Sequence, residues 1–101
     1  MPTNQMRPIH PGEFLRHDVL EELGISASAL ARALHVPKNR ITAILNEQRS
    51  ITADTALRLA RYLGGSAQFW INLQATYDLK RTEQAVGKTV LTEVRPLERA
   101  A

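Results

Sequence analysis

The positions of helix-capping residues constrain the fold of this chain more than any other feature of its sequence. Pro11, Ser26, Pro37, Thr52 and Ser66 each stand at the start of a run in which apolar residues recur every three or four positions. Proline suits a first helical turn because its missing N–H would be unpaired there, and a Ser or Thr hydroxyl can accept a hydrogen bond from a free N–H one turn further on. The sequence therefore predicts five helices and an all-α fold.

A single small core is expected, because 101 residues allow one compact domain and little more. Helical spacing points one face of each predicted helix inwards, and Gly24 and Gly64 mark two of the helix ends. The residues expected in this core are Phe14, Leu15, Val19, Leu23, Leu30, Ala31, Leu34, Ile41, Ile44, Ala56, Leu59, Ala60 and Leu63.

Only the C-terminal part of the chain carries a strand signal. KTVLTEVRPL, residues 88–97, contains Val90 and Val94 in a β-favouring run that ends near Pro96. One strand cannot satisfy its own backbone, so it must pair with another chain, lie as an extended arm or stay disordered. We therefore divide the chain into an N-terminal arm (1–7), a domain (8–79) and a C-terminal extension for dimerisation or partner contact (80–101).

Composition excludes several classes of protein. The sequence has no cysteine, so neither a disulfide framework nor a thiolate zinc site is available. No apolar run approaches the ~20 residues of a membrane span, and the opening MPTNQMRPIHPG lacks the apolar core of a signal peptide. The 13 Lys and Arg residues against 10 Asp and Glu permit a polyanionic partner without demanding one. We expect a soluble cytoplasmic protein that does not associate with membranes.

Neither an enzyme active site nor a metal site is predicted. No nucleophile elbow, phosphate loop or His–Cys pair occurs, and the adjacent carboxylates of Glu21 and Glu22 diverge on a helix. His10, Glu13 and His17 come near one helical face, but so sparse a set at a helix start is more often solvated than metal-binding. We expect His10 to lie near the cap of the first helix, and we expect no cofactor.

The stretch ALHVPKNRITAILN, residues 33–46, has the dimensions of a helix-turn-helix unit. A short helix ends near Leu34, and the next helix begins at Lys38 after a connection of about three residues. Ile41 and Ile44 face the core, so at about 100° per residue a polar, cationic tip faces outwards. A solvated surface helix in a bundle would show the same spacing and is the alternative interpretation.

The first turn of the second helix in this unit carries the predicted contacts to DNA, because that helix lies in the major groove and reads base edges with its N-terminal residues. Lys38 can donate to guanine, Asn39 can pair with adenine, and Thr42 or Ala43 can touch a thymine methyl. Phosphate contacts are expected from Arg40, from an arginine in the following loop and from free N–H groups at helix starts. The predicted DNA-binding residues are Ser26, Ala27, Pro37, Lys38, Asn39, Arg40, Thr42, Ala43 and Arg49.

His35 departs mildly from the expected turn of this unit. Its position often requires a positive φ, which glycine adopts most easily. Histidine tolerates that conformation better than most residues, at a cost of about 1 kcal/mol. The motif is therefore weakened but not excluded.

FWINLQATYDL, residues 69–79, spreads apolar and aromatic side chains over more than one helical face, more than so small a domain is expected to cover. A homodimer interface is predicted, although the same residues could simply complete the core. A two-fold axis would set two recognition helices about 34 Å apart, on a palindromic operator. The residues predicted at this interface are Phe69, Trp70, Leu73, Tyr77, Val90 and Val94.

Four motifs in this sequence are fairly specific: HPGE at the first helix, VP followed by a polar residue and Arg, R-x-IT-x-DTALRLAR, and F-W-x-NLQ-x-x-YDL. Over residues 8–79 the sequence resembles the HigA family of addiction-module antitoxins, a branch of the Cro/cI-type (XRE) helix-turn-helix regulators. The C-terminal tail lies outside this resemblance, and His35 stands where related regulators commonly have glycine.

The resemblance implies a five-helix DNA-binding domain that works as a homodimer and represses its own operon. It also implies a RelE-like toxin, a ribonuclease that cuts messenger RNA at the ribosome, which the antitoxin binds and neutralises. The family's base-reading and backbone-contacting helix corresponds to Lys38, Asn39, Arg40, Thr42 and Ala43. The toxin contact stays open between the first helix with its N-terminal arm and residues 88–97, which could add a strand to a sheet edge.

Two further functions share much of this evidence. A free-standing repressor without a toxin would have the same fold, and nothing in the predicted recognition helix separates it from an antitoxin. A protein-interaction module that no longer binds DNA is the other, and the polar, cationic Lys38-Asn39-Arg40 argues against it.

Overall fold

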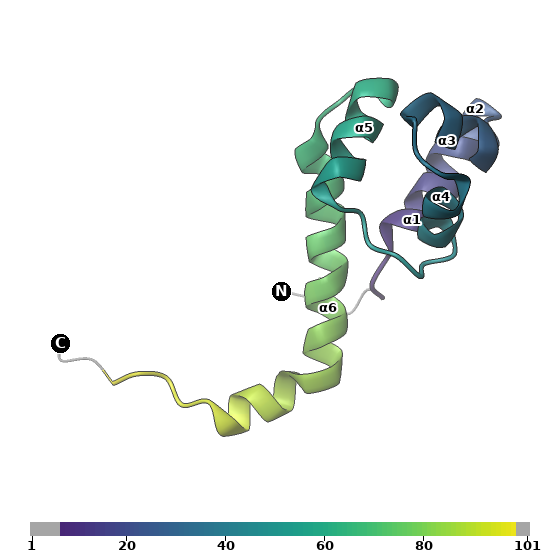
Figure 1. Ribbon diagram of the computed structural model, residues 1–101. Helices are drawn as coiled ribbons and strands as arrows, with labels where there is room; N and C mark the ends of the chain where they lie inside the picture. Colours follow the sequence, from purple (N-terminus) through teal and green to yellow (C-terminus); the bar gives the residue numbers. More distant parts are fainter. Residues whose placement is uncertain (1–6, 99–101) are drawn as a thin grey trace.

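The structure is a computed structural model that describes residues 7–98, and it is built from helices (Figure 1). Within these residues there is no strand, and the predicted all-α class is confirmed. A continuous first helix is followed by four more, as the capping residues predict. The elements are α1 (Pro11–Phe14), the π-helical segment η2 (Leu15–Leu20) and α2 (Glu21–Leu23), which make up the first helix, then α3 (Ala27–Leu34), α4 (Lys38–Leu45), α5 (Ala53–Leu63) and α6 (Ala67–Glu93).

Three of the predicted caps form the expected hydrogen bonds. The hydroxyl of Ser26 accepts from the backbone N–H of Ala29 at 3.1 Å, and Thr52 and Ser66 cap α5 and α6 in the same way. Gly24 ends the first helix with a φ of 66°, in the left-handed region that glycine adopts without a steric penalty. The helix bounds are therefore encoded locally.

The π turn in the first helix changes which of its residues are buried. Leu15 and Leu20, five positions apart, both lie in the core, because a π turn brings residues at that spacing onto one face. Leu23 is displaced from that face and its side chain is 58% exposed. The prediction that Leu23 belongs to the core is therefore wrong, since it assumed regular α-helical spacing.

The core lies where the first helix, α3, α4 and α5 meet the beginning of α6. Phe14 extends it by contacting two aromatic rings of α6, with centroid distances of 5.4 Å to Phe69 and 5.7 Å to Trp70. Val19 and Leu63 pack at its edge. The buried apolar residues are Leu15, Leu20, Leu30, Ala31, Leu34, Ile41, Ile44, Leu45, Ile51, Ala56, Leu59 and Trp70.

The C-terminal strand was wrongly predicted. α6 continues without a break through residues 80–93, and residues 94–98 are neither helix nor strand. A helix that is already formed needs only to be propagated, and Gly87 costs it about 1 kcal/mol. The first proline beyond it is Pro96, so the helix meets no stronger obstacle before that point. In Figure 1 the last turns of α6 extend away from the other helices.

Candidate nucleic-acid interface

The exposed start of α4 is the centre of the candidate interface. Lys38 and Asn39 form its first turn and are both exposed, and Pro37 precedes them as the N-cap residue. Ile41 and Ile44 are fully buried on the opposite side of the same helix. The predicted separation between a polar tip and an anchoring apolar face is therefore present.

The turn between α3 and α4 has the backbone geometry expected of a helix-turn-helix. His35 has a φ of 59°, in the left-handed region, and its N–H donates to the carbonyl of Arg32 at 3.2 Å. The N–H of Val36 donates to the carbonyl of Ala31 at 3.1 Å, which completes the helix end. The positive φ predicted for His35 is confirmed.

Close contacts with the first helix set the orientation of α4. Gly12 lies so close to α4 that a Cβ atom added to it would stand 1.9 Å from the carbonyl oxygen of Ile44. At the far end of α4, the guanidinium of Arg16 donates to the carbonyl of Leu45 and to the side chain of Asn46, both at 3.3 Å. Neither contact was predicted; the glycine of HPGE was the available signal.

Arg40 lies on the side of α4 that faces α5. Its guanidinium donates to a carboxylate oxygen of Asp54 at 2.7 Å, and Arg58 donates to the same oxygen at 2.9 Å. The hydrogen bond from Arg58 has the larger effect and the one from Arg40 the next; together they lower the pKa of the Asp54 carboxyl below its ordinary value. Arg58 also donates to the carbonyl of Leu34 at 2.8 Å. Arg40 is therefore part of a network joining α3, α4 and α5, and its phosphate contact stays a prediction.

The remaining predicted DNA-binding residues flank this tip. The hydroxyl of Thr42 donates back to the carbonyls of its own helix at 3.3 Å, which leaves its methyl group for an outside contact. Ala43 is half-buried, and Arg49 is exposed in the loop between α4 and α5. Ser26 and Ala27 begin α3.

A buried histidine supports that loop from the other side. The Nδ1 atom of His10 accepts from the N–H of Gly12 at 2.8 Å, which confirms its predicted place near the first cap. Its ring packs edge-on against Tyr77, with the centroids 4.8 Å apart. Burial lowers the pKa of His10, although the carboxylates of Glu47 and Asp78 act in the opposite direction. Burial therefore favours the neutral form of the His10 ring.

Gln74 ties the same loop to α6. Its side-chain oxygen accepts from the N–H of Ile51 at 2.7 Å, and its amide nitrogen donates to Asp78 at 3.0 Å.

Glu47, with a φ of 63°, is the second non-glycine residue in the described chain with a left-handed backbone. Sequence reasoning found neither residue, because a glutamine on a helix and a glutamate in a loop look like ordinary surface positions.

The aromatic residues predicted at a dimer interface have different surroundings. Trp70 is only 4% exposed and completes the core, so the expectation that the domain cannot cover it is wrong. Phe69 is exposed, Leu73 is half-buried, and Tyr77 is half-buried against His10. Val90, on the distal part of α6, is 48% exposed, and Val94, which directly follows the helix, is 63% exposed. Phe69, Leu73, Val90 and Val94 therefore stay accessible to a partner, and Tyr77 is partly covered by His10.

Two further expectations concern metals and membranes. The residues considered for a metal have separate partners: His10 caps α1, Glu13 binds the guanidinium of Arg7 at 2.6 Å, and His17 lies 3.2 Å from Glu21. None of the helices described is long and apolar enough to cross a membrane.

Comparison with known proteins assigns the chain to a family. A helix-turn-helix family model matches residues 17–70, which run from the middle of the first helix to the start of α6. The matched segment contains the whole α3–turn–α4 unit. The chain therefore belongs to the helix-turn-helix regulators, and the prediction that it is not an enzyme is confirmed by that membership.

Individual relatives define the family more narrowly. The chain is 62% identical to virulence-associated protein I of Dichelobacter nodosus, over 80% of its own length and 75% of that protein. It is 52% identical to an addiction module antidote protein of the HigA family from Coxiella burnetii, with a TM-score of 0.87 over 91% of this chain and 100% of that one. The antitoxin HigA of Pseudomonas aeruginosa, solved with the higBA promoter, is also 52% identical, with a TM-score of 0.88 over the same shares. The chain belongs to the HigA family of antitoxins.

Proposed function

We propose that this chain is the antitoxin of a type II toxin–antitoxin system, which binds operator DNA as a repressor of its own operon and neutralises a RelE-like, mRNA-cleaving toxin. The observation that carries the DNA-binding part is the exposed first turn of α4, where Lys38 and Asn39 stand opposite a fully buried anchoring face. A helix held at a fixed angle with donors at its start fits the major groove.

Base reading is assigned to the two exposed residues of that turn. Lys38 donates to guanine O6 or N7, and Asn39 pairs with both the N6 and N7 positions of adenine. The methyl groups of Thr42 and Ala43 are placed for a thymine methyl. The two side chains that donate to base edges, Lys38 and Asn39, are both exposed.

Phosphate contacts position this helix on the duplex. The free N–H groups at the starts of α3 and α4 offer hydrogen bonds and a positive helix dipole to phosphates, and Arg49 adds a charge from the loop. Arg40 reaches a phosphate while Asp54 holds its guanidinium in place. The similar antitoxin of Pseudomonas aeruginosa was solved with promoter DNA, which supports this assignment.

A homodimer on a palindromic operator completes the repressor. Val90 and Val94 near the C-terminal end of α6, with Leu73 nearer its start, form the proposed contact between two copies. Two α4 helices related by a two-fold axis enter successive major grooves about 34 Å apart.

The DNA-binding part is tested with a Lys38→Ala/Asn39→Ala double variant and its upstream operator at a fixed salt concentration. Each base contact is worth about 1 to 3 kcal/mol, so specific binding weakens by at least tenfold while thermal stability stays unchanged. Lys88→Ala, which removes an exposed charge from the far end of α6, is the matched control. If the double variant bound the operator as tightly as the wild type, α4 would not be the reading helix.

The antitoxin part is tested with the product of the adjoining open reading frame. Expressed alone, a RelE-like ribonuclease stops growth and cleaves messenger RNA. Coexpression with this chain restores growth and prevents the cleavage. The names of the similar structures, antidote and antitoxin, support this part of the proposal. An operator-binding chain with no toxin gene beside it would instead be a free-standing repressor.

A further inference from the structure

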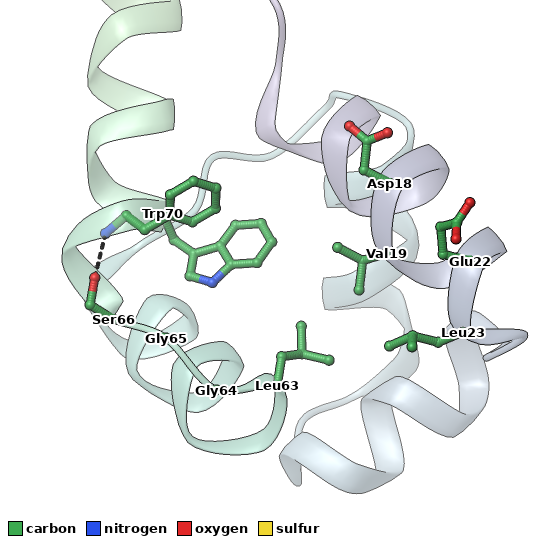
Figure 2. Close-up of a pocket in the computed structure, with 10 residues that line it drawn as sticks. Asp18, Val19, Glu22, Leu23, Leu63, Gly64, Gly65, Ser66 and Trp70 are labelled. Carbon is green, nitrogen blue, oxygen red and sulfur yellow. Dashed lines mark hydrogen bonds between the residues drawn. The ribbon is translucent and has the colours of Figure 1, made fainter.

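A hollow of about 500 Å³ lies between the first helix and the turn that joins α5 to α6. Figure 2 shows Val19, Leu23 and Leu63 pointing towards the indole of Trp70 across this hollow. Phe69, exposed beside it, adds an aromatic edge. The walls are thus largely apolar although the hollow opens at the surface, and exposed apolar groups rimmed by polar residues are one mark of an interaction site.

Two carboxylates stand at the rim of this hollow. Asp18 and Glu22 belong to the helix that forms one of its walls, and both are exposed. Among residues 7–98 neither has an ion-pair partner, whereas Glu13, Glu21 and Asp54 do. No Lys or Arg lines the hollow. We call Asp18, Val19, Glu22, Leu23, Leu63 and Phe69 the acidic hollow.

The charge of the acidic hollow is opposite to that of the chain as a whole, which carries a net charge of +3. Carboxylates repel the phosphates of DNA, so this surface is unsuited to the operator. It shares no residue with the DNA contacts proposed around α3, α4 and the loop that follows. A second macromolecule can therefore use it without competing for the reading helix.

A ribonuclease has the chemistry that fits the acidic hollow. An enzyme that binds RNA needs Lys and Arg side chains for the phosphate backbone, so its substrate-binding surface is cationic. Carboxylates can take the place of phosphates on such a surface, and the adjoining apolar walls can accept an apolar side chain that flanks a basic one. An arginine beside Phe69 would also gain a cation–π contact.

We infer that the acidic hollow docks the toxin, by receiving a segment in which Arg or Lys flanks a large apolar side chain. The inference rests on the proposed antitoxin function and assigns it a surface. A stable interface buries about 800 Å² on each partner, so the hollow is the anchor of a larger contact. Charge pairing at its rim speeds association and makes binding sensitive to salt.

The test measures binding of the purified product of the adjoining toxin gene to full-length variants by calorimetry. Asp18→Lys/Glu22→Lys and, separately, Leu23→Ser change the acidic hollow at exposed positions. Glu21→Lys and Leu57→Ser make the same kinds of change at exposed positions outside the acidic hollow and serve as matched controls. Operator binding by every variant reports whether its fold and reading helix are intact.

We expect the charge reversal to weaken toxin binding by at least tenfold and to reduce its salt dependence, and Leu23→Ser to weaken it several-fold. Both controls should bind the toxin as the wild type does, and all variants should bind the operator normally. If wild type binds the toxin and the acidic-hollow variants bind equally well, the inference is wrong while the antitoxin function stands. Loss in the Leu57→Ser control alone would place the toxin on α5 instead. Failure of the wild type itself to bind would contradict the proposed function.

Discussion

Gly12 in the first helix lies against the carbonyl of Ile44 in the recognition helix at a distance that leaves no room for a Cβ atom. In Gly12→Ala the methyl carbon would stand 1.9 Å from that oxygen, so α1 and α4 must move apart. We expect a loss of about 1 to 3 kcal/mol in the free energy of unfolding, as in other overpacked sites, and weaker operator binding. Urea denaturation and a binding titration measure the two effects.

Gly87→Ala is the control for this substitution. Gly87 is also helical, but the nearest atom to an added Cβ is 4.0 Å away. Alanine should therefore stabilise α6 by about 0.5 to 1 kcal/mol through helix propensity alone. Equal urea midpoints for Gly12→Ala and wild type would show that the contact between α1 and α4 does not constrain the recognition helix.

His10 makes the stability of the domain depend on pH. Its pKa in the fold is lowered from the ordinary 6.5, chiefly by burial, so the unfolded chain binds more protons than the native one between the two pKa values. Stability must then rise with pH in that interval. The contribution of His10 is complete above 6.5 and is lost as the pH falls through the lowered pKa.

His10→Asn tests this dependence, because asparagine also accepts at an N-cap but does not titrate. Free energies of unfolding from pH 5 to pH 8 should show a shallower slope for the variant than for the wild type. Asp54 also has a lowered pKa, but its contribution is lost at lower pH, below its ordinary 3.8. Parallel curves for the two proteins would mean that His10 is not the group responsible.

Two left-handed residues offer a test by stabilisation. His35 and Glu47 have φ values of 59° and 63°, where an L side chain is strained and glycine is not. We expect His35→Gly and Glu47→Gly each to raise the free energy of unfolding by about 0.5 to 1 kcal/mol. Glu83→Gly, in the right-handed backbone of α6, should lower it by about 1 kcal/mol. Thermal melts of the three variants measure these changes. A lower stability of both His35→Gly and Glu47→Gly than of the wild type would contradict the predicted strain at these residues.

The sequence predicted what local chemistry determines. Helix bounds followed from Ser26, Thr52 and Ser66, whose hydroxyls make the expected caps, and the exposed tip of α4 followed from the spacing of its apolar residues. The strand prediction is wrong because it rests on the β-propensity of residues near Val90 alone. In the fold these residues continue a helix that begins at Ala67, and propagating that helix outweighs their local preference.

Contacts between distant parts of the chain could not be predicted from the sequence. The π turn that buries Leu20 and exposes Leu23 depends on packing around the core and has no local signal. Trp70 was assigned to a surface because the number of rings a small core can hold is unknown until the helices are placed. The pairing of Arg40 with Asp54 likewise joins residues on different helices.

Gln74 holds the loop between α4 and α5 through a single buried hydrogen bond. Replacing it with leucine, of similar size, leaves the N–H of Ile51 without its acceptor, which costs about 1 to 3 kcal/mol. Gln68→Leu removes an exposed glutamine whose hydrogen bond stays within α6, and it should change stability little. The free energies of unfolding of the two variants should therefore differ, and equal values would show that the loop needs no anchor on α6.

The distal part of α6 is the strongest candidate for the homodimer contact. Leu79, Val86, Val90 and Leu91 are exposed there, and the buried core has no member beyond Gln74 in the described chain. A chain ending at Leu79 should therefore keep its fold yet sediment as a monomer, with operator affinity reduced because each half-site is bound alone. Val90→Asp should have the same effect, whereas Trp70→Glu would disrupt the core and report nothing about the interface. Sedimentation velocity separates the outcomes: a truncated chain that stays dimeric would move the contact to the part of α6 around Leu73.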